Sequence, residues 1–385
     1  MSSSRKYPLA TIGLIGGGQL GRMTIKAAKR LGATCTILDP DDHCPACQLA
    51  SKQLVAGYYD EDAIRQLANE VDVLTFELED IDTDTLASLE TEGKAVYPSS
   101  AVLKTIQDKL VQKQFLADNG IPTSEFIEAN APSAELFEQF GYPLVQKARR
   151  GGYDGRGVAI MKTADNFDKH LPVPSLIERF IKADKEIAIL VARSTKGEVK
   201  TYPPVEMLFN DENMLDILLA PALIPETVAQ KAQRIAEKTV EALNGVGIFG
   251  VEMFVTEDGQ VLVNEIAPRT HNSGHHTIEA NITDQFEQHL RAILGLPLGS
   301  TETLCPAAMV NLLGAPGETG KPELRGLDET LSISGVNLHL YGKNKTSPYR
   351  KMGHITILDK DIKQAAEKAA LVKTLITIGA EKNDE

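Results

Sequence analysis

Strand-like and helix-like segments alternate through the first hundred residues, and this alternation is the strongest constraint on the fold. The apolar run TIGLIG at 11–16 leads into an amphipathic segment that Gly32 can end, and TCTILD at 34–39 follows. A further apolar run, DVLTFE at 72–77, precedes a second helix-like segment near 82–92. Short apolar strands separated by amphipathic helices are typical of a parallel sheet covered by helices. The pattern therefore predicts an α/β unit.

The pattern changes after Pro122, where strands are expected to pair as hairpins. A helix predicted over about 100–119 ends at Gly120 and Pro122. Beyond it, strand-like segments joined by short turns predict an α+β unit up to about residue 300, with one core helix at about 225–244. A chain of 385 residues is long enough for two or three domains. We place their boundaries at 1–105, 106–305 and 306–385.

The composition excludes several kinds of partner. Lys and Arg number 40 against 53 Asp and Glu, a formal net charge of −13, and no basic block of the kind that binds nucleic acid is present. No apolar run reaches the roughly 18 residues of a membrane span, and the first residues do not resemble a signal peptide. We therefore expect a cytoplasmic protein without nucleic-acid or membrane partners.

A C-x-x-C pair, Cys44 and Cys47, belongs to a total of four cysteines. The pair could be a redox couple or half of a zinc site, but the chain has no second C-x-x-C. We favour reduced thiols without a metal or redox role.

A glycine loop follows the first expected strand. Gly16, Gly18 and Gly21 fit the G-x-G-x-x-G pattern, and Asp39 ends the next strand. Glycines let the backbone approach a phosphate at a helix N-terminus, so the loop is compatible with NAD binding. A tight strand-to-helix turn needs the same glycines without any cofactor. The motif alone leaves both interpretations open.

Two glutamates are expected to face each other across a hairpin. Asp258 and Gly259 are typical of a two-residue turn between strands, and a loop of those two residues places Glu252 directly opposite Glu265. Their Cβ atoms would then lie about 4.5–5.5 Å apart, which is destabilising unless a proton or a cation intervenes. A hard cation such as Mg²⁺, shared with phosphate oxygens, resolves the conflict. A solvated sheet edge is the alternative, and the apolar flanking residues argue against it.

A second glycine-rich loop, at 147–157, contains four glycines and four cationic side chains between two expected strands. Such a loop is suited to closing over a polyphosphate and excluding water. The alternative is a solvated basic hairpin tip, although a simple turn would not need so many glycines.

Together these segments resemble the ATP-grasp superfamily, and within it the family of 5-(carboxyamino)imidazole ribonucleotide synthases. The resemblance is carried by GGGQLGRM (16–23), RRGGYDGRGV (149–158), GVEMF (250–254), NEIAPRTHNSGHHTIEA (264–280) and YRKMGHI (349–355). It covers nearly the whole chain. It implies a Rossmann-like domain at 1–105, an ATP-grasp domain at 106–305, and a small C-terminal domain at 306–385 that completes the substrate site.

The resemblance also implies a reaction and its participants. ATP would phosphorylate bicarbonate to carboxyphosphate, which would carboxylate the amine of 5-aminoimidazole ribonucleotide in purine biosynthesis, with release of ADP and phosphate. Mg²⁺ held by Glu252 and Glu265 would neutralise charge on the phosphates. The implied catalytic residues are Arg269, Asp154 and His275. A homodimer is implied as well.

Further residues are implied for each ligand. ATP would contact Lys109, Lys147, Gly152, Tyr153, Asp154, Gly155, Arg156, Gly157, Val158, Glu178, Arg179, Phe180, Ile181, Glu186, Phe209, Asn264 and Glu265. The ribonucleotide or bicarbonate would contact Tyr153, Arg156, His271, Asn272, Ser273, Lys343, Arg350 and Lys351.

The chain departs from the family pattern at two positions. Phe209 stands where the family usually has His, so that nucleotide contact would be lost or replaced by stacking. Lys109 stands where Arg is common, which keeps the charge but loses the planar fork. In addition, Asn264 is the family's companion to Glu265, yet strict alternation points adjacent residues to opposite faces, so a local bulge would be needed.

Four alternatives are weighed against this interpretation. An NAD-dependent oxidoreductase would use the loop at 16–21 but leaves the paired glutamates unexplained. A glycinamide ribonucleotide transformylase that uses formate belongs to the same superfamily. Zinc held by the histidines of 271–276 is disfavoured because no cysteine lies near them in the sequence. A purely structural role is least compatible with the combined loops and carboxylates.

Overall fold

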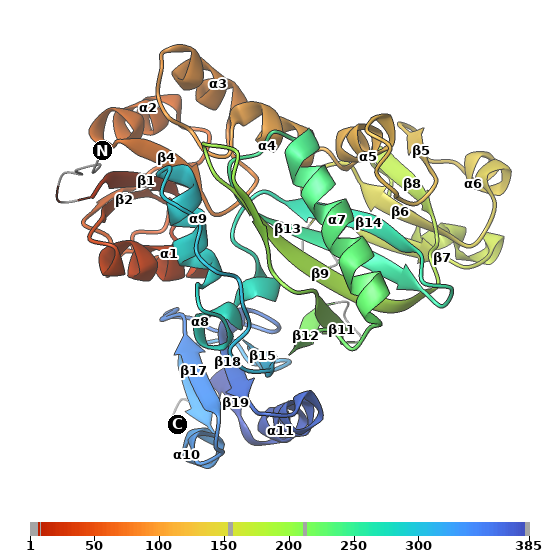
Figure 1. Ribbon diagram of the computed structural model, residues 1–385. Coiled ribbons are helices and arrows are strands. Elements are labelled where there is room, and N and C mark those ends of the chain that lie inside the picture. The colour runs from red at the N-terminus through yellow and green to blue at the C-terminus, as the bar shows by residue number, and fades with distance from the viewer. Residues whose placement is uncertain (1–6, 8, 153–156, 211–213, 382–385) are drawn as a thin grey trace.

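The structure, a computed structural model, describes residues 7, 9–152, 157–210 and 214–381 (Figure 1). Four residues that the resemblance assigns to ligands, Tyr153, Asp154, Gly155 and Arg156, lie outside this described part. No helix in the described ranges has both the length and the apolar character to cross a bilayer.

The N-terminal unit is built on a four-stranded parallel sheet, as the alternation predicts. Its strand order is β3-β2-β1-β4, and Ile12, Leu14 and Ile37 lie in its core. The strands are β1 (Thr11–Ile15), β2 (Thr34–Leu38), β3 (Lys52–Leu54) and β4 (Val73–Phe76), and helices α1 (Gln19–Arg30), α2 (Glu61–Glu70) and α3 (Thr83–Thr91) pack on them. The predicted α/β unit is confirmed.

A nine-stranded sheet runs through the centre of the molecule. Its order is β14-β13-β9-β11-β12-β15-β18-β17, with β10 paired to β9. The strands of the central unit are β9 (Ala183–Arg193), β10 (Val199–Thr201), β11 (Val205–Phe209), β12 (Leu215–Ala220), β13 (Gly247–Thr256) and β14 (Val261–Ala267). Helix α7 (Glu226–Ala242) buries Ala232, Ala236 and Val240 against this sheet, where the sequence predicts a core helix.

The C-terminal unit continues the same sheet. β15 (Ala307–Leu313) pairs with β12, so the ladder crosses the domain boundary placed at residue 306. The other elements of this unit are β16 (Pro322–Arg325), α10 (Leu327–Leu331), β17 (Val336–Leu340), β18 (Lys351–Leu358), α11 (Ile362–Leu375) and β19 (Thr377–Ala380). Helix α11 buries Ala365, Ala369 and Val372 against the sheet.

A separate four-stranded antiparallel sheet, in the order β5-β8-β6-β7, forms a small lobe that extends to the right in Figure 1. Its core contains Phe137, Leu144 and Met161. The elements are β5 (Phe126–Ala129), α6 (Ala134–Phe140), β6 (Leu144–Ala148), β7 (Val158–Met161), a 3₁₀ turn (Ala164–Lys169) and β8 (Ser175–Arg179).

Two helices, not one, lead into this lobe. The predicted helix over 100–119 is broken into α4 (Ser100–Gln107) and α5 (Lys109–Asp118) by Asp108, which has an extended backbone. Its carboxylate accepts the N–H groups of Leu110 and Val111, so Asp108 acts as the N-cap of α5.

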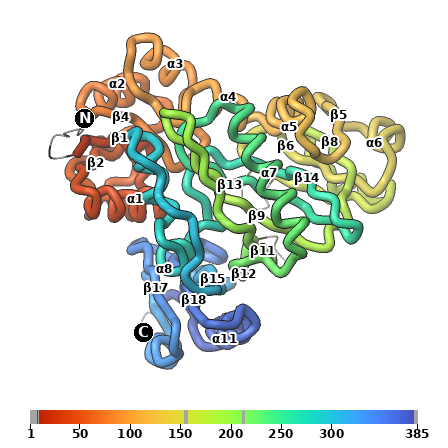
Figure 2. The backbone as a smooth tube through the Cα atoms, viewed as in Figure 1, coloured from red at the N-terminus to blue at the C-terminus, as the bar shows by residue number. Residues whose placement is uncertain are grey.

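Helix α9 (Gln285–Ile293) holds the N-terminal unit against the central sheet (Figure 1, Figure 2). From its buried face, His289 accepts a hydrogen bond at Nδ1 from the Ile248 N–H of β13, at 3.2 Å. Its Nε2, 2.8 Å from Thr75 Oγ1 of β4, must therefore carry the proton of the neutral ring. Burial lowers the pKa of His289 to about 4, because a second proton would charge the ring inside the core.

We predict that His289 makes the protein less stable in mild acid. Its pKa is lower in the folded than in the unfolded chain, where it is about 6.5, so stability is retained above about pH 6.5 and lost as the pH falls towards 4. The variant His289→Asn keeps an acceptor for Ile248 but cannot titrate. The free energy of unfolding, measured in urea, should fall more between pH 7.5 and pH 5.5 in the wild type than in the variant. The difference should be up to about 1.4 kcal/mol per pH unit. Equal losses in both proteins would contradict this assignment.

Candidate active site

The predicted carboxylate pair lies on the hairpin of β13 and β14. Glu252 and Glu265 are direct partners in the antiparallel register, as the sequence predicts. The predicted two-residue turn is wrong, however, because Thr256 N–H bonds Gln260 C=O at 3.0 Å and leaves a three-residue loop. Gly259 at φ +75° is the left-handed third residue that such a loop requires.

A bulge restores the predicted pairing further along the hairpin. Met253 pairs with Val263 while Glu252 pairs with Glu265, so Asn264 is the extra residue on β14. The bulge that the sequence requires for Asn264 is therefore present. Asn264 can face the same region as Glu265, and its Oδ1 accepts a hydrogen bond from Lys147 at 2.8 Å.

The pKa values of the two glutamates are shifted in opposite directions. The pKa of Glu252 is raised to about 7 by burial and by the nearby carboxylates of Glu265 and Glu186. Burial would also raise the pKa of Glu265, but the Lys109 ammonium, 2.6 Å from its Oε1, outweighs this and lowers it. The imidazole of His271 approaches Glu252, with Nε2 3.3 Å from Oε1. A cation between the glutamates would relieve the remaining repulsion.

The donor set around this pair fits Mg²⁺. Two carboxylates and the Asn264 carbonyl oxygen are hard oxygen donors. Over the described ranges, no cluster of three or more His, Cys, Asp or Glu side chains could hold a metal by itself. Mg²⁺ typically takes one or two carboxylates together with phosphate oxygens, so a complete protein cage is not required.

Three lysines line the same cavity as the buried carboxylate of Glu178, and two of them contact it. Lys113 Nζ and Lys147 Nζ each lie 2.8 Å from one oxygen of Glu178. Burial would raise the pKa of Glu178, but the two ammonium groups lower it to about 2. Lys109 completes the group, and together with Gln112, Leu176, Asn264 and Glu265 these residues line a small cavity between the two sheets.

The segment at 178–181 connects the small lobe to the large sheet. Its Arg179 side chain turns away to the carbonyl oxygens of Phe140 and Gly141, at 2.7 and 2.9 Å. The chain then passes through Phe180 and Ile181 to β9. The ATP contacts that the resemblance implies for these residues stay predictions.

On β9, Glu186 pairs with Met207 of β11, and burial raises its pKa. Phe209 ends β11 with 37% of its surface exposed, beside an irregularity in the ladder. Exposed phenyl surface at this position is compatible with stacking on a base.

The glycine-rich loop at 147–157 closes on itself at its base. Lys147 pairs with Val158, and the Gly157 C=O accepts the Ala148 N–H at 2.8 Å. Gly157 has φ +74°, and a Cβ there would lie 3.3 Å from the Cα of Gly152. The two ends of the loop are thus packed too closely for larger residues.

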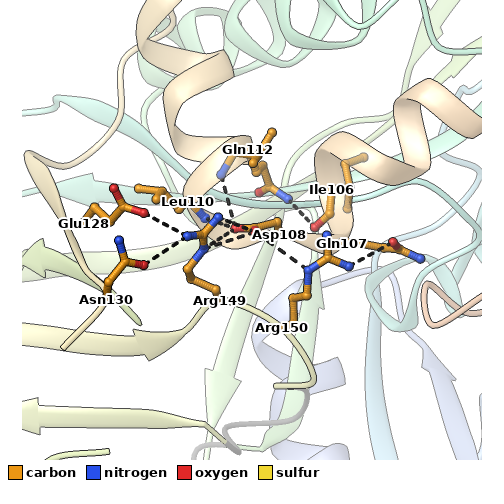
Figure 3. Close-up of polar contacts among 10 residues, drawn as sticks. Ile106, Gln107, Asp108, Leu110, Gln112, Glu128, Asn130, Arg149 and Arg150 are labelled. Carbon is orange, nitrogen blue, oxygen red and sulfur yellow. Dashed lines mark hydrogen bonds and ion pairs between the residues drawn. The ribbon is translucent and has the colours of Figure 1, made fainter. Parts of the chain in front are cut away.

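Arg149 anchors the helix that carries the lysines (Figure 3). Its guanidinium bonds both oxygens of Asp108, with Nη2 2.7 Å from Oδ2, and reaches Glu128 with Nη1 at 2.8 Å. Its C=O accepts the Lys109 N–H. The sequence analysis counts Arg149 among the cations of a loop suited to closing over a polyphosphate, and in the structure its side chain fixes α5 to β6.

The first glycine loop is filled by the protein's own carboxylates. The Gly17 N–H donates to Asp39 Oδ2 at 2.7 Å, and the N–H groups of Gly18 and Gly21 donate to Glu77. The Gly16 N–H is bonded to Leu38 C=O. These are the donors that a dinucleotide pyrophosphate would need, so the NAD interpretation is not supported.

Sequence analysis missed Glu77 and Glu79. Both follow β4, whose carboxyl end lies beside the carboxyl end of β1 in the parallel sheet. Ligands bind at this edge of such sheets, so the position of the two glutamates in the sequence could have identified them. Glu79 Oε1 lies 2.7 Å from Nη2 of Arg269, which follows β14. The predicted bicarbonate residue therefore lies at the border between the N-terminal and central units.

The loop after Arg269 presents an amide without protein partners. Within the described part of the chain, Nδ2 and Oδ1 of Asn272 are buried without a hydrogen-bond partner. Its neighbour His271 has Nδ1 2.8 Å from Ser273 Oγ. An amide left unpaired in this way is suited to a small polar ligand such as bicarbonate.

His275 lies behind this loop. It is buried, its ring centroid lies 4.6 Å from that of His354, and burial lowers its pKa well below the ordinary value. The catalytic role that the resemblance implies for His275 stays a prediction.

The three basic residues expected to bind a phosphate group lie together in the C-terminal unit. Lys343 Nζ donates to the Lys351 C=O at 2.7 Å, and Arg350 Nη1 donates to the Lys345 C=O at 2.7 Å. Lys351 also affects the pKa of His275, which places this group beside the loop of Arg269.

A larger groove, of about 650 Å³, lies on the opposite face of α5 and is lined by Leu110, Val111, Phe115 and Phe126 among others. It lacks the paired carboxylates and the lysines, so we do not place the active site there.

Comparison with known proteins agrees with this geometry. Residues 9–107 match the ribonucleotide synthetase preATP-grasp domain, 114–286 the ATP-grasp domain, and 307–368 the phosphoribosylaminoimidazole carboxylase C-terminal domain. Among curated proteins, phosphoribosylaminoimidazole carboxylase of Schizosaccharomyces pombe is 43% identical over 93% of this chain. The match spans 66% of that longer protein.

Two solved structures are similar along nearly their whole length. N5-carboxyaminoimidazole ribonucleotide synthetase from Thermotoga maritima has a TM-score of 0.91 and 50% identity, covering 97% of this chain and 100% of that one. The N5-carboxyaminoimidazole synthase of Aspergillus clavatus, in complex with ADP and 5-aminoimidazole ribonucleotide, has a TM-score of 0.88 and 35% identity. That match covers 95% of this chain and 98% of the other.

We predict that the Asp108 ion pair stabilises the α5 junction. Asp108→Asn keeps a cap for α5 but removes the charged partner of Arg149, so the free energy of unfolding in urea should fall by about 1–3 kcal/mol. Arg150→Gln is the matched control, since its Nε lies 3.8 Å from Asp108 and 60% of the side chain is exposed. The free energy of unfolding of the control variant should change by no more than about 0.5 kcal/mol. If Asp108→Asn behaves like the control, the pair does not hold the junction.

Proposed function

The chain belongs to the N5-carboxyaminoimidazole ribonucleotide synthase family, and from this we propose that it carboxylates 5-aminoimidazole ribonucleotide with bicarbonate and ATP. The products are N5-carboxyaminoimidazole ribonucleotide, ADP and phosphate, in purine biosynthesis. Bicarbonate attacks the γ-phosphorus of ATP and ADP leaves, which forms carboxyphosphate. The exocyclic amine then gains the carboxyl group, phosphate leaves, and the amine loses a proton.

The observation that carries the proposal is the register of the hairpin. Glu252 and Glu265 face each other with Asn264 bulged beside them, next to the buried Lys113 and Lys147 and the partly buried Lys109. Glu252 and Glu265 would hold Mg²⁺, which supplies charge neutralisation on the β- and γ-phosphates when bound. Lys109 and Lys147 would contact the phosphates. Few structural roles would justify two facing carboxylates that are partly buried in a sheet.

The nucleotide base would lie along the segment that joins the two sheets. The backbone of Glu178, Arg179, Phe180 and Ile181 would meet the adenine, since the side chains of Glu178 and Arg179 already have partners. Glu186 would accept hydrogen bonds from the ribose hydroxyls. Phe209 would stack in place of the family's usual histidine.

The reacting groups would lie at the loop after β14. Arg269 would bind bicarbonate and carboxyphosphate through its planar fork, and the Asn272 amide would complete their hydrogen bonding. Arg269 must then exchange its contact with Glu79 for the substrate. His271, 3.3 Å from Glu252, would link this loop to the metal side of the site.

The ribonucleotide would span the central and C-terminal units. Lys343, Arg350 and Lys351 would bind its 5′-phosphate. Tyr153, Asp154 and Arg156, together with Gly152, Gly155, Gly157 and Val158 of the same loop, would close over the ligands. A cytoplasmic homodimer is part of the proposal and would be tested by sedimentation.

The activity is tested by phosphate release. Purified protein with Mg²⁺, ATP, bicarbonate and 5-aminoimidazole ribonucleotide should release phosphate in an amount equal to the carboxylated product. Replacing bicarbonate by formate and the ribonucleotide by glycinamide ribonucleotide tests the transformylase alternative. Phosphate release that does not depend on 5-aminoimidazole ribonucleotide would refute the proposal.

We predict that Glu265→Gln abolishes ATP turnover while the fold is kept. The amide removes one of the two facing charges, so folding should be little affected, but the metal loses a carboxylate and kcat should fall by at least about 100-fold. Glu257→Gln, at the exposed end of the same hairpin, is the matched control and should turn over normally. Near-normal turnover in Glu265→Gln would remove Glu265 from the metal site.

A further inference from the structure

Lys113 is a buried cation that has no assigned role in the reaction. It follows Lys109 by four residues on α5, so both side chains leave the same face of the helix. Its Nζ donates to Thr123 Oγ1 at 2.6 Å and Ser124 Oγ at 3.0 Å, and lies 2.8 Å from Glu178. Only 2% of the residue is exposed. These contacts leave Lys113 little room to reach a ligand.

The charges around Glu178 do not cancel. One carboxylate is paired with two ammonium groups, those of Lys113 and Lys147. Lys147 makes a further bond to the neutral Asn264 amide. Glu265 and Glu252 also attract Lys147, but Glu265 is paired with Lys109, and the pKa of Glu252 is raised to about 7. The side chains that line the cavity therefore comprise three ammonium groups and two carboxylates, which leaves one excess positive charge. Burying an unbalanced charge is costly unless something compensates for it.

The excess charge lies on the phosphate side of the cavity. Lys113 and Lys147 both line the cavity, but Lys147, which is 8% exposed, also contacts Asn264, whereas Lys113, which is 2% exposed, is held by the hydroxyl groups of Thr123 and Ser124. If Lys113 were absent, Glu178 would pair with Lys147 alone and would neutralise it.

We propose that Lys113 is a positioning residue for nucleotide binding: it balances the charge of Glu178 and thereby leaves the charge of Lys147 available to the phosphates. This inference rests on the nucleotide site proposed above and adds to it a residue that does not touch the nucleotide. Lys113 acts through Glu178. Because Lys113 belongs to α5, this charge balance requires that α5 is held in a fixed position.

Two contacts fix α5 in the required position. The side chain of Gln112 accepts the Ile266 N–H of β14 at 3.0 Å. At the start of the helix, Asp108 is clamped by Arg149 (Figure 3). Helix α5 is thereby tied to both sheets, which fixes the backbone of Lys113, and the hydroxyl groups of Thr123 and Ser124 hold its side chain beside Glu178.

The test is a charge-balance series measured by calorimetric binding of Mg·ADP. Lys113→Met should weaken binding about 10- to 100-fold, because Lys147 is then neutralised by Glu178. In the double variant Lys113→Met/Glu178→Gln, Lys147 is again unbalanced, and binding should recover to within about threefold of the wild type. A structural role predicts the opposite, since the double variant removes more polar contacts than either single change.

Steady-state kinetics supply a second measurement. Lys113→Met should raise KM for ATP with little change in kcat or in KM for the ribonucleotide, because ground state and transition state lose the same interaction. Lys238→Met, which removes a lysine that bonds the Gly120 C=O on the surface, is the matched control and should leave both constants unchanged.

The outcomes separate this inference from the proposed function. Mg·ADP binding within twofold of the wild type in Lys113→Met, or weaker binding in the double variant than in Lys113→Met, overturns the role of Lys113. If Lys113→Met does not fold, Glu178→Gln decides: it raises the excess charge, so tighter binding supports the inference and weaker binding overturns it. A wild-type protein that binds no Mg·ADP would instead refute the nucleotide site itself.

Discussion

Two carboxylates held face to face between β-strands are the constraint on which the rest of this site depends. Like charges directly opposite in a sheet are destabilising, and burial increases the cost. The structure responds differently at each one: Lys109 compensates Glu265, while Glu252 keeps a raised pKa beside the imidazole of His271. Without a ligand, the repulsion between the two carboxylates lowers the stability of the folded protein. A divalent cation bound between them would remove this repulsion.

The pairing of these carboxylates follows from the sequence, although the path to it contains two offsetting irregularities. Asp258 and Gly259 indicate a turn, but a glycine at the third position of a longer loop satisfies the same local chemistry. The longer loop shifts the ladder by one residue, and the bulge at Asn264 shifts it back. A bulge depends on side chains from other elements, here Lys147, so local sequence does not specify it.

Other features depend on contacts between distant segments and could not be predicted from local pattern. Helical periodicity continues through Asp108, but its bond with Arg149, 41 residues away, favours a break in the helix. The glycines at 16–21 have the spacing of a dinucleotide site, yet Glu77 reaches them from another strand and occupies their N–H groups. In each case a charged side chain far along the chain decides between two conformations that the local sequence allows.

The same ion pairs explain how an acidic chain can bind anionic ligands. In the described site, Lys109 contacts Glu265, Lys147 contacts Glu178, and Arg269 contacts Glu79. Each cation is therefore held in position by a carboxylate before any ligand arrives, which lowers the entropy cost of ordering long side chains on binding. A phosphate group must then compete with those carboxylates for the cations. It competes best where the cations outnumber the carboxylates, or where a metal ion binds the carboxylate and so releases its cation. Glu178 with two lysines meets the first condition, and the facing glutamates meet the second.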